Sequence, residues 1–245
     1  MEGVEVLRVA DLQTEKPDLI INIMPFDEIR YMTGVPACYW EIDNHLVRGR
    51  NTVYYDLMDK VYIPQESYSD NYPIKKTDIL PLAVDPDLHK RIDGVPVKYD
   101  IGFIGNDTYP ERRELLELME RKYKVLRTNT QPGLPYSEAL SSCALTFNRS
   151  MDKDVNMRFF EAIATGRLLL TDYLPQQDKY AQAGVHYETY KDWAELDKKI
   201  EYFLTIDSER EQKGRDGASH IRTNHTYKHR LEKILQDFCL LKEEV

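Results

Sequence analysis

The sequence predicts an α/β protein made of two domains, each built on a parallel sheet. Three observations support this prediction. Short apolar runs recur through the first 95 residues, and several lack polar alternation, as expected of strands that helices cover on both faces. The pattern begins again at Tyr99. A strand, loop, helix and second strand then follow from Asn148 to Asp172, and helical patterns complete the chain.

The composition is that of a globular protein. Of 245 residues, 42% are hydrophobic and 31% are charged, which suffices for one large or two small cores. No apolar run approaches the ~20 residues that span a bilayer, and Met1 opens no recognisable leader, so we expect a cytoplasmic location. Three widely spaced cysteines are expected to be reduced packing residues, because they fit neither a disulfide framework nor a zinc site.

The net charge of −9 argues against a broad nucleic-acid interface. Small basic groups at Arg48 with Arg50, and at Lys75 with Lys76, are more typical of solvated faces than of binding sites.

The first domain is expected to span residues 1–95. A turn-rich segment from Asp85 to Pro96 marks its end, so the second domain would span residues 96–245. The predicted strands of the first domain are Val4–Val9, Leu19–Met24, Ala37–Ile42, Val61–Ile63 and Ile79–Val84.

Asp43 and His45 follow the third of these strands, at the carboxyl edge where parallel sheets bind ligands. Either residue could face an acceptor and act as a general base. The pattern fits equally well an Asp43 that caps a turn and a His45 that is exposed to solvent.

The second domain opens with a strand that runs into Gly105. This glycine would let the backbone pass close to a ligand, and Asn106 could bond to a phosphate or sugar, although a single glycine is also typical of an ordinary tight turn. The next predicted elements are a helix at Pro110–Arg121, a strand at Val125–Arg127, a helix at Tyr136–Cys143 and a strand at Ala144–Asn148.

The segment from Asn148 to Asp172 carries the strongest chemical signal. Its helix should begin near Asp154 as N-cap and end at Gly166 in a left-handed conformation, before a strand at Leu168–Thr171. Apolar residues follow the helical period on one side, whereas Arg158, Glu161 and Thr165 share another face. A helix start at the carboxyl edge of a sheet favours a phosphate, and a carboxylate two turns in could reach sugar hydroxyls. The alternative is a surface helix with a solvated Glu161.

The remaining residues predict helices at Leu174–Ala183, Lys191–Leu204, Ser208–Thr223 and Thr226–Lys242, with Trp193 in the core. His225 and His229 lie four residues apart and could share a helix face as metal ligands. No third ligand accompanies them, so we expect no metal.

The run NMRFFEAIATGRLLLTD, residues 156–172, resembles the donor-site segment of GT-B glycosyltransferases in the branch typified by the spore-maturation protein CgeB. The phrases KPDLIINI, LPLAVDP and HTYKHR resemble further segments of that branch. The resemblance implies two facing Rossmann-like domains with a nucleotide-sugar cleft between them. Only about fifteen residues precede Lys16, so the N-terminal, acceptor-side domain would be abbreviated.

The resemblance also implies roles for individual residues. Glu161 would hold the ribose of the donor, and Asn156, Met157 and Arg158 at the helix start would receive the diphosphate. Other candidates for the donor site are Gly105, Asn106, Arg112, Arg113, Asn148 and Arg149, of which Arg113, Asn148 and Arg149 would stabilise the departing diphosphate.

Position 153 departs from the pattern of the branch. Many relatives carry a sugar-facing acidic residue eight positions before this glutamate, where the present chain has Lys153. Arg149 could also be an ordinary surface cation.

The resemblance implies a metal-independent glycosyltransferase that needs no cofactor and uses a nucleotide-sugar donor, expected to be UDP-linked. The acceptor could be a glycan, a small molecule, a protein or a modified nucleotide. Two alternatives are a nucleotide-binding module without transfer activity and a DNA-modifying glycosyltransferase; net acidity disfavours the latter.

Overall fold

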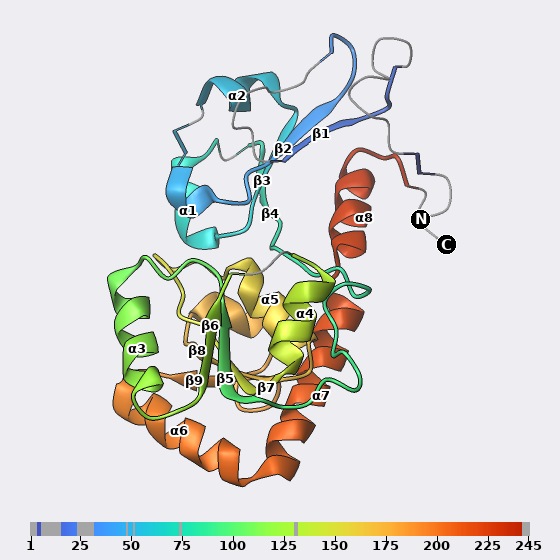
Figure 1. Ribbon diagram of the computed structural model, residues 1–245. Coiled ribbons are helices and arrows are strands. Elements are labelled where there is room, and N and C mark those ends of the chain that lie inside the picture. The colour runs from blue at the N-terminus through green and yellow to red at the C-terminus, as the bar shows by residue number, and fades with distance from the viewer. Residues whose placement is uncertain are drawn as a thin grey trace. The chain divides into compact units, whose positions relative to one another are not determined.

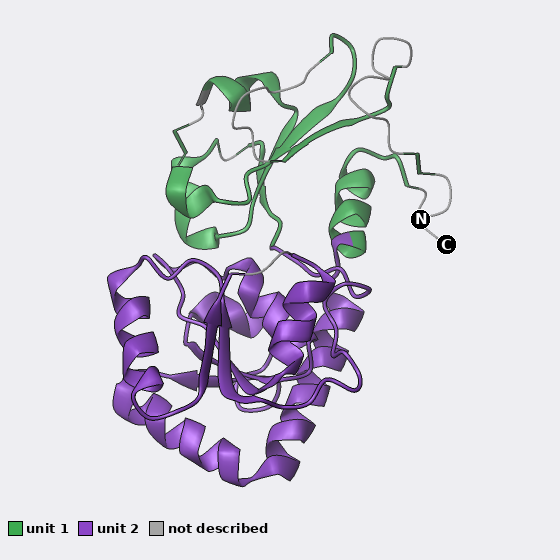
Figure 2. Cartoon of the chain, in the orientation of Figure 1, with its two compact units in different colours: residues 1–81, 228–245 green, residues 82–227 purple. Residues whose placement is uncertain are grey.

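The computed structural model describes residues 4–5, 16–23, 32–47, 49–50, 52–73, 75–129 and 132–241. The chain forms two compact units, coloured separately in Figure 2. Unit 1 comprises Met1–Pro81 with Lys228–Val245, and unit 2 comprises Leu82–Tyr227.

The boundary between the units differs from the one expected at residue 95, because residues 82–95 are hydrogen-bonded to the rest of unit 2. The backbone N–H groups of Lys90 and Ile92 donate to the hydroxyls of Ser137 and Ser141, at 3.3 and 2.9 Å.

The C-terminal helix belongs to unit 1. Arg230 Nε donates to the carbonyl of Pro81 at 2.8 Å, and Asp237 accepts from Tyr62 at 2.8 Å and pairs with Lys60 at 2.9 Å.

Unit 1 contains a four-stranded parallel sheet in the order β1-β2-β3-β4, visible in Figure 1. The strands are β1 (Ile20–Ile23), β2 (Ala37–Trp40), β3 (Lys60–Ile63) and β4 (Thr77–Ile79). The helices are α1 (Asn44–Val47), α2 (Thr52–Leu57), α8 (Tyr227–Asp237) and the 3-10 helix η2 (Glu66–Asn71).

Two of the strands predicted for this unit do not match the structure over their full length. β4 ends at Ile79 rather than continuing to Val84, because Pro81 has no N–H to donate to the ladder. Most of the strand predicted at Val4–Val9 lies outside the described residues, as does Arg48, and Val4 and Glu5 are not in a strand.

A buried carboxylate occupies the core of unit 1. Glu41 is 1% exposed and accepts hydrogen bonds from the hydroxyls of Tyr39, at 3.0 Å, and Tyr55, at 3.2 and 3.0 Å, and also from Tyr72. These donors offset the cost of removing a carboxylate from water.

Unit 2 contains a five-stranded parallel sheet in the order β6-β5-β7-β8-β9. The strands are β5 (Tyr99–Ile104), β6 (Val125–Thr128), β7 (Cys143–Phe147), β8 (Leu168–Asp172) and β9 (Glu188–Tyr190). The helices are α3 (Pro110–Glu120), α4 (Leu134–Ser141), α5 (Met157–Ala164), α6 (Trp193–Thr205), α7 (Asp207–Asn224) and the 3-10 helix η3 (Pro175–Lys179).

Helices pack on both faces of this sheet. α3 and α6 share one apolar core with β5, β7 and β8, whereas α4, α5 and α7 lie on the other side in Figure 1. Trp193 packs against the first core, as predicted. Burial on both faces explains why β7 and β8 are uniformly buried and carry no polar alternation.

Two local predictions in unit 2 are wrong, and one strand was not predicted. The helix predicted at Leu174–Ala183 is only the short η3, and β9, a three-residue strand at the sheet edge, was not predicted. The N-cap of α5 is Asn156 rather than Asp154, since Asn156 Oδ1 accepts from the backbone N–H of Phe159 at 3.2 Å.

A buried arginine joins the elements on the α4 and α7 side. Arg167 is 2% exposed, and its guanidinium pairs with Glu211 on α7 at 2.9 Å and donates to the carbonyl of Ser141. The exposed Arg91 pairs with the same Glu211 carboxylate.

Cys38 and Cys143 are buried free thiols, as predicted, whereas Cys239 is exposed. Within the described part of the chain, no helix combines the length and apolar character required to cross a membrane.

Candidate active site

The strand order of unit 2 places a topological switch point at the carboxyl edge of its sheet. The chain runs outward from β5 to β6 and then returns to β7 on the opposite side of β5. The connections that leave β5 and β7 therefore run in opposite directions along the sheet, and open α/β sheets bind ligands at such a switch point. Gly105 follows β5, Asn148 follows β7, and the next helix is α5, so the predicted donor segment converges there.

Arg158 in the first turn of α5 is the central cation. Its Nε donates to the carbonyl of Ile104 at 2.7 Å and its Nη1 to Asn148 Oδ1 at 3.0 Å. The guanidinium lies 4.5 Å from the centroid of the Phe103 ring. Burial lowers the pKa of Arg158 from its usual value, but an arginine remains charged at physiological pH.

A glycine is required at position 105, because the backbone there passes close to the guanidinium of Arg158. Its φ is +138°, and a Cβ there would lie 2.0 Å from Arg158 Nη2. The close approach brings the β5 loop and the α5 cation together.

Asn148 links the other elements of the switch point. It is fully buried, donates to Thr171 Oγ1 at 3.1 Å, and accepts from Asn156 Nδ2 at 3.4 Å. Its carbonyl accepts from the Tyr190 hydroxyl at 2.8 Å. Asn148 therefore orients Arg158 and the helix start, while Met157 is 36% exposed beside them.

Glu161 lies one turn further along α5. Its side chain is 15% exposed, and Oε1 lies 3.4 Å from Nε2 of His89, whose side chain is 8% exposed. Burial raises the pKa of Glu161, while His89 and Arg158 act in the opposite direction. The alternative of a merely solvated surface glutamate does not fit this burial.

The two predicted arginines of α3 have different environments. Arg112 is 4% exposed, and it donates to the carbonyls of Asn106, at 2.5 Å, and Arg149, at 3.0 and 2.5 Å. Burial, with Arg158 nearby, lowers its pKa to about 10. Arg113 is exposed and donates to the Thr108 carbonyl at 3.2 Å.

Asn106 is exposed and closes its own turn, accepting from the N–H of Thr108 at 2.8 Å. Arg112 therefore braces the two loops that follow β5 and β7, and Arg113 is the more accessible cation.

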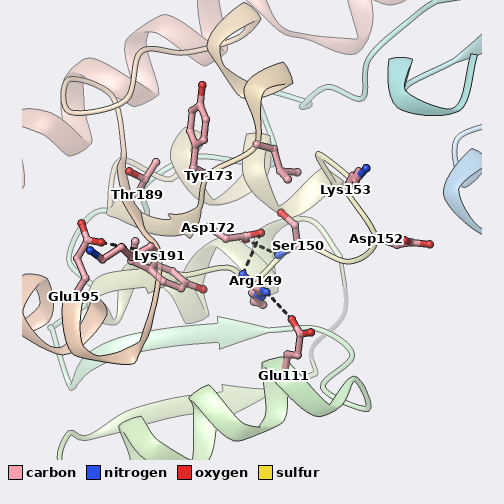
Figure 3. A pocket seen from close by; sticks show the side chains of 12 residues that line it. Glu111, Arg149, Ser150, Asp152, Lys153, Asp172, Tyr173, Thr189, Lys191 and Glu195 are labelled. Atoms are coloured by element: carbon pink, nitrogen blue, oxygen red, sulfur yellow. Dashed lines mark hydrogen bonds and ion pairs between the residues drawn. The ribbon is translucent and has the colours of Figure 1, made fainter.

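Arg149 borders a cavity of about 430 Å³ at the carboxyl ends of β7, β8 and β9 (Figure 3). It pairs with Glu111 at 2.5 Å and with Asp172 at 3.6 Å. Lys153 also lines the cavity and has a φ of +63°. Arg149 is the single predicted donor-site residue in this lining, so the cavity adjoins the switch point without including Glu161.

Asp43 and His45 belong to unit 1. The Asp43 carbonyl accepts from the N–H groups of Leu46 and Val47, at 2.9 and 3.3 Å, and so starts α1. His45 lies in α1 and is 4% exposed, which contradicts the alternative of a solvent-exposed histidine.

The two candidate metal ligands differ in their surroundings. His225 packs against the rings of Phe160 and Tyr180, whereas His229 is exposed. Among the described residues, no three His, Cys, Asp or Glu side chains cluster as metal ligands.

Sequence reasoning missed His89 and Tyr136. His89 lies in the turn that was predicted to connect the domains, and Tyr136 lies on α4, where its ring meets that of His89 edge to face with centroids 6.0 Å apart. Neither residue belongs to a recognisable motif, so only the tertiary structure shows that both lie beside Glu161.

Solved structures with the same fold include glycosyltransferases. HepE from Anabaena, solved with UDP and glucose, has a TM-score of 0.64 at 11% identity, over 84% of this chain and 72% of HepE. Sucrose-phosphate synthase from Thermosynechococcus elongatus has a TM-score of 0.61 at 12% identity, over 84% of this chain and 67% of the synthase. TarM from S. aureus has a TM-score of 0.61 at 11% identity, over 83% of this chain and 50% of TarM. The fold is thus the α/β fold of GT-B glycosyltransferases.

The sequence defines the family more directly. The profile of the glycosyl transferase-like family matches residues 87–236, which is more than half of the chain. The chain therefore belongs to this family, in agreement with the resemblance of its α5 segment. No curated protein matches the chain significantly in sequence.

Proposed function

We propose that unit 2 binds a nucleoside diphosphate-sugar at the β5–β7 switch point and that the chain transfers the sugar to an acceptor hydroxyl. One observation carries the proposal: in a chain of the glycosyl transferase-like family, the α5 start, the half-buried Arg158 and the carboxylate of Glu161 meet at this edge. The α5 start and Arg158 offer positive charge to a diphosphate, and the Glu161 carboxylate can accept hydrogen bonds from ribose hydroxyls.

The diphosphate would lie over Gly105 and the first turn of α5. Backbone N–H groups of a helix start have no intrahelical partner and can donate to phosphate oxygens. Arg158 beneath Gly105 would add a fixed positive charge, held by Asn148 so that it need not reorganise when the leaving group gains charge. Asn156, Met157 and Asn106 complete the rim.

Arg149 and Arg113 would supply further charge to the leaving diphosphate. Arg112 would act indirectly, because its hydrogen bonds fix the carbonyls of Asn106 and Arg149. No metal or other cofactor is proposed, since these cations and the helix start would perform the electrostatic role that a metal performs in other transferases.

UDP-sugars are the first candidate donors. HepE, which shares the fold, was solved with UDP and with UDP-glucose. We further propose that the chain is cytoplasmic and belongs to the CgeB-like branch, with unit 1 as the acceptor-side domain. Asp43 and His45 are its candidate acceptor-facing groups.

Thermal denaturation tests the donor site. Wild type and Glu161→Ala would be melted with UDP, GDP, dTDP and CDP and with their sugar conjugates, with Glu117→Ala on the exposed face of α3 as control. A ligand at 100 times its dissociation constant stabilises the native state by about 2.7 kcal/mol. We expect one nucleotide to stabilise wild type and Glu117→Ala but not Glu161→Ala. Failure of every nucleotide at millimolar concentration would refute the proposal.

A binding module without transfer activity is the second candidate, because Lys153 occupies the position where relatives carry a sugar-facing acid. Release of the nucleoside diphosphate from the bound donor decides between them. Turnover supports the enzyme, whereas tight binding without release in the presence of varied acceptors supports the module.

A further inference from the structure

Two side chains with no assigned role lie beside Glu161. His89 Nε2 is 3.4 Å from Glu161 Oε1, and the hydroxyl of Tyr136 is buried without a hydrogen-bond partner among the described residues. Tyr136 itself is 7% exposed. Its pKa is raised mainly by burial and further by the charge of Glu161, while Arg158 lowers it, so both α5 charges act on this hydroxyl.

The surroundings of His89 determine which ring nitrogen carries the proton. Nδ1 lies 3.2 Å from the N–H of Asp85 and 3.1 Å from the Asp85 carbonyl. That carbonyl already accepts from the N–H groups of His89, at 2.8 Å, and Leu88, at 3.2 Å. The Asp85 N–H is the group that needs a partner, so Nδ1 accepts and the neutral ring carries its proton on Nε2. Nε2 then donates to Glu161.

This hydrogen bond engages Glu161 Oε1, whereas Oε2 makes no hydrogen bond or ion pair within the described part of the chain. The carboxylate is therefore held in one orientation with an oxygen available to a ligand. A buried hydroxyl without a partner costs about 1–3 kcal/mol, so Tyr136 also requires a group that the protein does not supply.

We propose that Glu161 and Tyr136 bind the vicinal hydroxyls of the donor's ribose, with His89 as the positioning residue that fixes Glu161. This inference rests on the proposed function and adds a specificity to it: the protein selects ribonucleotides over 2′-deoxyribonucleotides. A diol matches the pair because one hydroxyl can donate to the carboxylate while its neighbour bonds to the phenol.

The test compares UDP and GDP with their 2′-deoxy forms by calorimetric titration. Wild type should bind the ribose form at least about tenfold more tightly, the effect of one buried hydrogen bond to a charged network. Tyr136→Phe should bring the ratio of the two affinities toward one, because it should weaken binding of the ribose form. Tyr187→Phe is the matched control, since its hydroxyl is also buried without a partner in the described structure.

His89 is tested by two substitutions. His89→Leu removes the hydrogen-bond donor and should weaken binding of the ribose form. In this variant, binding should be lost at a higher pH than in wild type as the pH is lowered, because His89 no longer lowers the pKa of Glu161. Arg158 and Tyr136, the other ionisable groups acting on Glu161, are unchanged. His89→Gln can donate from its amide and should restore part of the affinity and the wild-type pH profile.

The outcomes separate the two proposals. If UDP or GDP binds and Glu161→Ala abolishes binding, but Tyr136→Phe leaves the ribose preference unchanged, the inference fails and the proposed function stands. An unshifted pH profile in His89→Leu overturns the positioning role. If no nucleoside diphosphate of the thermal-denaturation panel binds wild type, both proposals fail.

Discussion

Replacement of Gly105 by alanine tests the geometry at the switch point. The residue has a φ of +138°, and the new Cβ would lie 2.0 Å from Nη2 of Arg158. The guanidinium cannot move away freely, because it is bonded to the Ile104 carbonyl at 2.7 Å and to Asn148 Oδ1 at 3.0 Å. Gly105→Ala should therefore strain the backbone and displace the central cation.

The expected cost follows from these two effects. A backbone held in so unfavourable a region costs about 1–3 kcal/mol, and a lost hydrogen bond from a buried charged group costs about 1.5–3 kcal/mol. We expect Gly105→Ala to lower the free energy of unfolding by about 2.5–6 kcal/mol, measured by denaturant titration. Gly94→Ala is the control: Gly94 has a φ of +77° with nothing within 4 Å, so only about 1–2 kcal/mol should be lost.

A double-mutant cycle isolates the clash with Arg158. In an Arg158→Ala background the alanine at position 105 meets no guanidinium, so only the backbone cost of about 1–3 kcal/mol should remain. The reasoning is refuted if Gly105→Ala costs the same in both backgrounds, or if it costs no more than Gly94→Ala.

Three further predictions concern other buried groups. Arg167→Ala should cost about 1.5–3 kcal/mol in denaturant unfolding, because the buried guanidinium loses its charged hydrogen bond to the half-buried Glu211, whereas Arg91→Ala on the exposed side of the same carboxylate should cost at most about 1 kcal/mol. Glu161→Gln should stabilise the protein at neutral pH, and the gain should shrink as the pH falls toward about 4.3, the unfolded pKa of glutamate. Iodoacetamide at neutral pH should alkylate Cys239 in the native protein but Cys38 only after unfolding, as peptide mass spectrometry would show, since burial raises the pKa of Cys38 to about 12.

The sign of the Glu161 effect follows from linkage. Burial raises the folded pKa, so the folded state binds the proton more tightly and stability falls as the pH rises from the unfolded toward the folded value. A stability difference between Glu161→Gln and wild type that grows toward low pH would contradict this. Equal costs for the two arginine substitutions, or native alkylation of Cys38, would contradict the other two predictions.

Local sequence patterns accounted for most of the second sheet. The apolar runs at β5, β7 and β8 and the helical period of α5 are short-range signals, because each strand or helix repeats its burial every few residues. Gly166, with a φ of +75°, ends α5 as its position after the helical run predicted. β9 was missed because three residues are too few to establish a period.

The sequence by itself determined the α/β class, the switch-point segment and the identity of Glu161 as the carboxylate of interest. Only the tertiary structure decided what surrounds these residues. Arg112 and Arg113 are adjacent in sequence, yet one is buried against loop carbonyls and the other is exposed. His89 and Tyr136 meet Glu161 from segments distant along the chain. Such contacts depend on how strands and helices pack, and a local pattern of hydrophobicity or charge carries no information about partners that lie far away in sequence.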